Sequence, residues 1–197
     1  MGRQSGKENV KKSCAGLLAH VDAGTTTLSE SMLLSAGVIR KGGRVDHGDS
    51  FLDYDAQERS RGITIFSKQA ILTWKGTEFT FIDTPGHVDF SAEMERTLSV
   101  LDYAVVLISG TDGVQPHTET IWKLLELYHI PAFIFVNKMD ISHLTQAQLE
   151  EELCRRLDKH CVSFMQDGAA RDEAAALCDD AALNEYMEHG SLGDETL

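Results

Sequence analysis

Short apolar runs alternate along this chain with segments whose apolar residues recur every three or four positions. Runs of that length suit strands, and the three- to four-residue period suits helices that bury one face. The pattern predicts strands at residues 14–19, 67–74, 78–83, 103–109 and 132–137. It predicts helices at residues 26–36, 91–101, 118–128 and 145–160. Such alternation is typical of an α/β domain with a mostly parallel sheet and helices on both faces. Gly76 in "WKGTE" marks a hairpin between the second and third strands.

Two regions depart from this alternation. Residues 37–61 are polar and contain several glycines, and a loop of that length in a compact domain is usually functional or mobile. After Cys161 the chain carries nine acidic residues against the single Arg171, with one helix expected at residues 174–189 and no further apolar strand. We therefore divide the chain into a disordered tail (1–12), a domain core (13–160) and an acidic helical segment (161–197).

The composition limits the classes of function. A chain of 197 residues with 42% hydrophobic residues can bury one core, and its net charge of −13 disfavours direct DNA binding. No apolar run approaches the roughly 18 residues of a membrane span, and the polar start lacks the apolar core of a signal peptide. The four cysteines show no C-x-x-C spacing, which gives no sign of a zinc or redox site. We expect a cytoplasmic protein that does not bind membranes.

The stretch "AHVDAGTTT" lies between the first strand and the first helix, where phosphate-binding loops occur. Backbone amides around Asp22 to Thr26 can converge on phosphate oxygens, and the Thr26 hydroxyl can bind Mg²⁺. The motif G-x-x-x-x-G-K-[ST] would place lysine after Gly24, yet Thr25 stands there. Because glycine turns from strand to helix are common, this stretch alone is weak evidence for a nucleotide site.

The stretch "DTPGH" follows the third strand. Asp83 can reach a magnesium-bound water from the strand end, and Gly86 can offer its amide to a terminal phosphate. His87 would then lie beside the terminal phosphate, which hydrolysis removes. In "RGITI", at the end of the long polar loop, Thr64 can complete the magnesium shell when that phosphate is present, although alone it would fit the start of a strand.

The stretch "NKMD", Asn137 to Asp140, follows the fifth strand. An aspartate carboxylate can accept two hydrogen bonds from the N1 and N2 donors of guanine, which adenine cannot supply. Unpaired polar groups then penalise the wrong base. This stretch predicts selection of GTP over ATP.

In this order the four motifs resemble the GTP-binding domain of translational GTPases over about residues 14–140. The likeness is closest to the elongation factor G group and its tetracycline-resistance ribosomal protection relatives. It is strengthened by "GRVDHGDSFLD", "ERTLSVLDYAVVLIS" and "DGVQPHTE". The phrases "LSVLD" and "VLISGTDGVQ" look more like the ribosomal protection branch than like elongation factor G.

The resemblance implies a P-loop GTPase domain that uses GTP, GDP and Mg²⁺ and acts on the ribosome. It implies metal contacts from Thr26, Thr64 and Asp83, and a catalytic role for His87, which orients the attacking water when the ribosome is engaged. In the family the position of Gly86 senses the γ-phosphate. The implied nucleotide-binding residues are Asp22, Ala23, Gly24, Thr25, Thr26, Thr27, Gly86, Asn137, Lys138 and Asp140.

The chain departs from the family pattern in two ways. Thr25 replaces the phosphate-loop lysine, and the last strand of the domain, with its Ser-Ala type motif near the guanine, is absent before Leu197. We therefore expect a domain that lacks its last strand. Two alternatives to a ribosomal protection factor stay open: an elongation factor G-like translocation factor, and a degenerate module whose nucleotide binding is impaired by Thr25.

Overall fold

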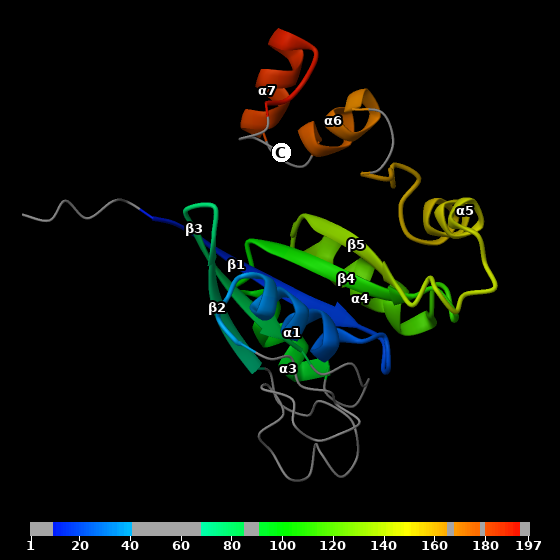
Figure 1. The fold of residues 1–197 in the computed structure, drawn as a ribbon. Helices are drawn as coiled ribbons and strands as arrows, with labels where there is room; N and C mark the ends of the chain where they lie inside the picture. Colours follow the sequence, from blue (N-terminus) through cyan, green and yellow to red (C-terminus); the bar gives the residue numbers. More distant parts are fainter. Residues whose placement is uncertain (1–9, 41–67, 85–90, 165–167, 178–179, 194–197) are drawn as a thin grey trace, which may run out of the picture.

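The structure is a computed structural model, and it describes residues 10–40, 68–84, 91–164, 168–177 and 180–193. Within these ranges the strands form one sheet in the order β2-β3-β1-β4-β5 (Figure 1). The strands are β1 (Lys11–Ala19), β2 (Lys68–Trp74), β3 (Thr77–Asp83), β4 (Tyr103–Ser109) and β5 (Ala132–Asn137). The helices are α1 (Thr25–Ser35), α3 (Ser91–Leu98), α4 (Pro116–Leu127), α5 (Gln146–Arg156), α6 (Gly168–Ala176) and α7 (Asp180–His189).

The sheet is mostly parallel, as the sequence pattern predicts. β1 runs parallel to both β3 and β4, and β4 runs parallel to β5. β2 is antiparallel to β3, and Lys75 and Gly76 form the hairpin turn with φ angles of 46° and 82°. The four parallel strands therefore end at one edge of the sheet, which is where α/β proteins bind ligands.

Both faces of the central strands are buried. Leu18, Val106 and Ile108 face a core formed with α3, α4 and Leu153 of α5. Leu17 and Leu107 face the other way and pack with α1. Figure 1 shows α1 in front of the sheet and α4 behind it. The consecutive residues Leu17 and Leu18 are both fully buried, which explains why these strands lack the alternation of a half-exposed strand.

The α1 face is less well covered where the sheet ends at β5. Tyr103, Phe133 and Phe135 keep more than two fifths of their surface exposed. Phe164 packs over Phe133, with ring centroids 5.6 Å apart. In the part of the chain that the structure describes, β5 is the edge strand of the sheet.

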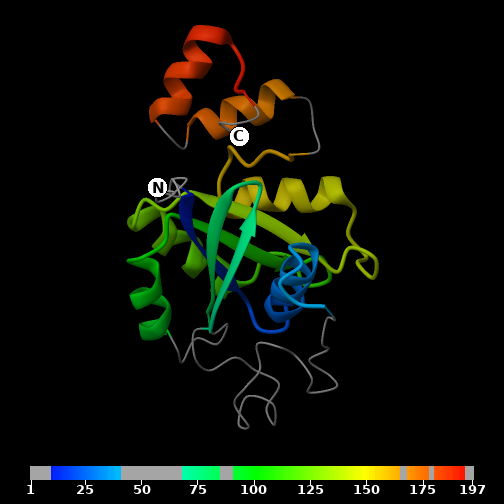
Figure 2. The same cartoon turned by 60° about the vertical axis from the view of Figure 1, so that its left-hand side comes forward.

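The sequence-based boundaries need two corrections. Lys11 and Lys12 belong to β1 and not to the tail, because they pair with Thr77 and Glu78 of β3, and Lys12 Nζ lies 2.8 Å from Glu78 Oε1. The acidic segment forms two helices, α6 and α7, where one helix over residues 174–189 was predicted. Figure 2 shows this pair away from the sheet, beyond α5.

The α6–α7 pair has a small core of its own. Ala176, Ala182 and Leu192 are buried together. The Asp172 carboxylate accepts hydrogen bonds from Arg171 and from the Leu192 backbone amide, at 2.9 and 3.2 Å. A continuous helix could not bring Leu192 back to Asp172, so the single predicted helix was wrong and the segment forms the separate helices α6 and α7.

Candidate nucleotide site

The loop between β1 and α1 has the backbone geometry of a phosphate cradle. Gly24 is the N-cap of α1, with φ 101° and ψ 32°, and Asp22 has φ 63°. Among the described residues, no side chain caps this helix end. The first-turn amides and the positive end of the helix dipole therefore face the loop and favour an anion there. A Cβ on Gly24 would lie 2.6 Å from Asn137 Nδ2, so this close approach requires glycine.

Two side chains from the end of β5 hold this loop. Asn137 Nδ2 donates to the Ala23 carbonyl at 2.9 Å, and Lys138 Nζ donates to the Asp22 carbonyl at 2.6 Å. Lys138 itself adopts φ 60°, a conformation that a non-glycine residue rarely holds. The tertiary structure thus joins the predicted phosphate-binding and guanine-reading segments, which lie more than 110 residues apart in the chain. Asp140 follows in an exposed turn.

Asp83 lies at the same edge of the sheet, at the end of β3. Its register partner is Leu17 of β1, and its side chain is buried. Thr84 anchors this strand end, because its amide and its hydroxyl both donate to the Leu17 carbonyl, at 3.2 and 2.9 Å. Thr26 is buried in the first turn of α1. A carboxylate and a hydroxyl are hard oxygen donors of the kind that Mg²⁺ prefers, so these two residues fit a magnesium site.

Thr25 is the first residue of α1 and is partly buried. Its carbonyl accepts a hydrogen bond from the Ser29 hydroxyl at 2.9 Å. Lys138 is not positioned as a substitute for the missing lysine, because its ammonium is bound to the carbonyl of Asp22. Thr27 is exposed, and Thr64, Gly86 and His87 lie outside the described residues.

Comparison with known proteins identifies the family. The family model described as the elongation factor Tu GTP binding domain matches residues 12–190. The chain belongs to this family. It is therefore a GTP-binding domain of the translational GTPase type.

A crystal structure of a protein from Thermus thermophilus has the same fold. The TM-score is 0.75 at 24% sequence identity, over 93% of this chain and 34% of that chain. The GTP-binding domain thus spans about a third of the length of that chain. At this identity the likeness concerns the fold alone.

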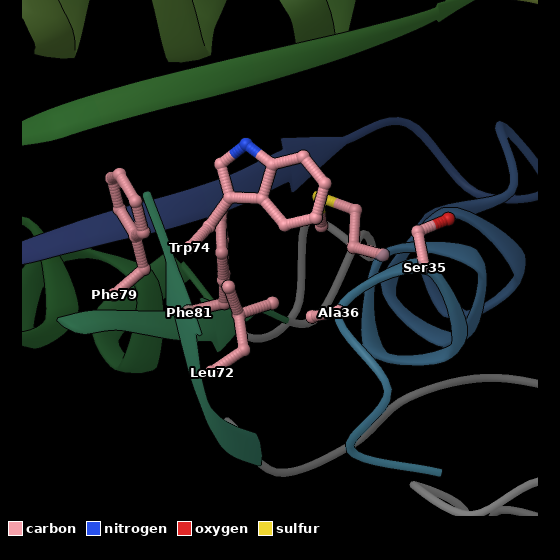
Figure 3. Close-up of a pocket in the computed structure, with 7 residues that line it drawn as sticks. Ser35, Ala36, Leu72, Trp74, Phe79 and Phe81 are labelled. Carbon is pink, nitrogen blue, oxygen red and sulfur yellow. The ribbon is translucent and has the colours of Figure 1, made fainter. Parts of the chain in front are cut away.

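A separate hollow lies between α1 and the β2–β3 hairpin (Figure 3). Its volume is about 290 Å³. The lining residues are Met32, Ser35, Ala36, Leu72, Trp74, Phe79 and Phe81. These residues are almost entirely apolar and come from the far end of α1 and from the hairpin, so the hollow does not suit a charged nucleotide. Among the described residues, no helix has the length and apolar character that crossing a bilayer requires.

Sequence reasoning missed several residues that support this site. The hydroxyl of Ser142 donates to the Gly110 carbonyl at 2.6 Å, and the Gly110 amide donates to the Asn137 carbonyl at 2.7 Å. The run "EEEL" predicts a solvated helix face that pairs with "RR" and Lys159, and its Glu152 does pair with Arg156 at 3.0 Å. Glu152 also accepts the Val114 amide, in the loop before α4, which the sequence did not predict. The i, i+4 pair of Glu152 and Arg156 is visible in the sequence, but its contacts to that loop are not.

Proposed function

We propose that this chain binds GTP and GDP with Mg²⁺ and serves as the nucleotide domain of a ribosome-dependent GTPase. The single observation that best supports this is the pair of hydrogen bonds from Asn137 and Lys138 to the carbonyls of Ala23 and Asp22. These bonds join the segment after β5 to the loop before α1, which supports a nucleotide that spans both segments.

Each predicted residue has a role in this proposal. Backbone amides of Asp22 to Thr27 bind the phosphates, and Asp140 accepts the N1 and N2 donors of guanine. Thr26, Thr64 and Asp83 hold Mg²⁺, which supplies positive charge against the phosphate oxygens when bound. Gly86 donates its amide to the terminal phosphate. His87 orients the attacking water.

Thr25 favours a second candidate function, a GTPase-like module with weakened nucleotide binding. The family lysine would place a point charge between the β- and γ-phosphates. Losing one charge-assisted contact of about 1.5–3 kcal/mol weakens binding roughly 10- to 150-fold. The backbone amides of the phosphate cradle and Mg²⁺ supply the remaining nucleotide affinity.

The deciding experiment titrates the purified chain and its Thr25→Lys variant with a fluorescent GDP or GTP analogue in the presence of Mg²⁺. We expect guanine-selective binding by both, at least about tenfold tighter in the variant because one charge-assisted contact returns. Equal affinities would mean that another group replaces the lysine. Binding only by the variant would place the defect at Thr25, and binding by neither would refute the proposal.

For the complete protein we propose a ribosomal protection factor that acts in the cytoplasm, with an elongation factor G-like translocation factor as the alternative. The proposal is supported by the phrases "LSVLD" and "VLISGTDGVQ". Expression of the complete protein in a tetracycline-sensitive host tests it. Growth in tetracycline supports a protection factor, whereas replacement of a depleted elongation factor G without such growth supports the alternative.

A further inference from the structure

Arg156, the last residue of α5, joins three parts of the fold. Its Nε donates to Glu119 Oε1 of α4 at 2.7 Å, and its Nη1 donates to Glu152 Oε1, one turn earlier in α5, at 3.0 Å. Nη1 also donates to the carbonyl of Val114, in the loop between β4 and α4. All three charged side chains are roughly two-thirds buried or more, so this is not a freely solvated surface pair. We call Arg156, Glu152 and Glu119 the Arg156 clamp.

Glu152 closes the clamp on the same loop from its other side. Its Oε1 accepts the Val114 amide at 3.3 Å, so the clamp binds both backbone polar groups of Val114. A Cβ on Gly113, where φ is +64°, would lie 2.6 Å from Glu152 Oε2. The backbone of the loop therefore lies directly against the clamp carboxylate.

The loop from Ser109 to Val114 is short and internally bonded. The amides of Asp112 and Gly113 both donate to the Ser109 carbonyl, at 3.1 and 2.9 Å. The Ser109 and Thr111 hydroxyls lie 2.6 Å apart. Hydrogen bonds therefore connect the residues next to Val114 with Ser109, at the start of the loop.

The start of the loop holds the guanine-reading segment. The Gly110 amide donates to the Asn137 carbonyl at 2.7 Å, and the Gly110 carbonyl accepts the Ser142 hydroxyl at 2.6 Å. These two contacts lie on either side of Asp140. Asp140 is itself in an exposed turn, so its position depends on how firmly the two flanking residues are held.

We propose that Arg156 is a positioning residue for guanine recognition, which acts through Val114 and Gly110 to fix the segment that carries Asp140. This inference rests on the proposed function, because it assigns Asp140 to guanine. Arginine suits the role because its planar fork can serve several acceptors at once, whereas a lysine ammonium is a point charge that cannot span them.

The test compares Arg156→Ala and Arg156→Lys with Arg155→Ala as the matched control. Arg155 is the neighbouring residue of the same helix turn, carries the same charge and is exposed, and none of the clamp contacts involves it. Hydrogen exchange of the Gly110 amide, followed by NMR without nucleotide, reports whether the loop is held. Relative binding of GDP and inosine diphosphate, which lacks the N2 donor, reports the position of Asp140.

In Arg156→Ala we expect Gly110 exchange to rise about tenfold over the control, because the loop opens more often. We expect preference for GDP over inosine diphosphate to fall about threefold or more, since the second hydrogen bond to Asp140 weakens. Arg156→Lys should fold like the unsubstituted chain and recover only part of both properties, so it decides the matter if Arg156→Ala fails to fold.

Equal Gly110 exchange in the Arg156 variants and the control would overturn the inference, as would faster exchange with an unchanged base preference. If neither the unsubstituted chain nor its Thr25→Lys form binds guanine nucleotide, the proposed function fails and guanine positioning fails with it. The exchange measurement needs no nucleotide, so it would still show whether the clamp holds the loop. When binding is present but weak, the base preference is measured in the Thr25→Lys form.

Discussion

Replacing Gly24 with alanine should destabilise the chain more than the same change at Gly37, another left-handed glycine. At φ 101° the new side chain strains the backbone, and its Cβ would lie 2.6 Å from Asn137 Nδ2. Such a contact forces the Asn137 amide away from the Ala23 carbonyl, which it now meets at 2.9 Å. The substitution therefore combines backbone strain with the loss of a hydrogen bond.

The two effects can be sized separately. An L-residue in a left-handed conformation costs about 1–2 kcal/mol. A broken intramolecular hydrogen bond costs about 0.5–1.5 kcal/mol. We therefore expect Gly24→Ala to lower the free energy of unfolding by about 1.5–3.5 kcal/mol, if the two losses add.

Gly37, just beyond the other end of α1, provides the control. Its φ is +72°, and a Cβ there would meet no atom of the described residues within 4 Å, so Gly37→Ala carries the strain without the collision. Urea unfolding followed by tryptophan fluorescence gives both free energies. We expect Gly24→Ala to lose about 1 kcal/mol more than the control, the size of one hydrogen bond.

A double substitution provides the sharper test. In an Asn137→Ala background the collision partner is gone, so Gly24→Ala should cost only the strain, as Gly37→Ala does. Equal losses from the two glycine substitutions in the unsubstituted chain would refute the collision argument. If Gly24→Ala still lowers the free energy of unfolding more than Gly37→Ala in the Asn137→Ala background, Asn137 is not the collision partner.

Three further predictions concern other parts of the chain. His87→Ala should lower ribosome-stimulated GTP hydrolysis with little change in nucleotide affinity, and equal loss of both would contradict its role with the attacking water. Burial raises the pKa of the Cys161 thiol from 9.0 to about 11, so the free energy of unfolding should fall as pH rises through that interval. Urea unfolding at both ends of the interval measures this loss of stability, which should be smaller in Cys161→Ala. An equal loss in Cys161→Ala would contradict the role of the thiol. Hydrogen bonds from Arg171 lower the pKa of Asp172, so its stabilisation is present above pH 3.8 and is lost as pH falls through the folded pKa. Asp172→Asn should speed hydrogen exchange of the Leu192 amide at neutral pH and make the free energy of unfolding less sensitive to acid pH. Unchanged Leu192 exchange would contradict the hydrogen bond between Asp172 and the Leu192 amide.

The sheet was the most predictable part of the fold. The predicted strands at residues 103–109 and 132–137 coincide with β4 and β5, because both are short, continuous apolar runs. The helix starts were less predictable. α4 begins at Pro116, two residues before the predicted start, since proline suits the first helical turn although it carries no apolar periodicity. The separation of α6 from α7 was missed because the two short helices lie close together in the sequence and read as one.

The predicted site was recognised from residue types, and the structure adds the contacts that link them. "AHVDAG" and "NKMD" each suggest a role alone, but only the fold shows that Asn137 supports the carbonyl of Ala23. Arg156 was missed because its partners Glu119 and Val114 lie 37 and 42 residues away in the chain. A charged residue near a helix end is indistinguishable in sequence from a solvated one.

The sequence by itself determined the order of the elements, the parallel sheet and the residue types of the nucleotide site, because apolar periodicity and glycine positions act locally. Only the tertiary structure decided that the loops after β1, β4 and β5 support one another, and that a Cβ on Gly24 would displace the Asn137 amide. Those facts depend on strand register and on hydrogen bonds between distant segments. Neither strand register nor such hydrogen bonds produce a periodic pattern of residues in the sequence.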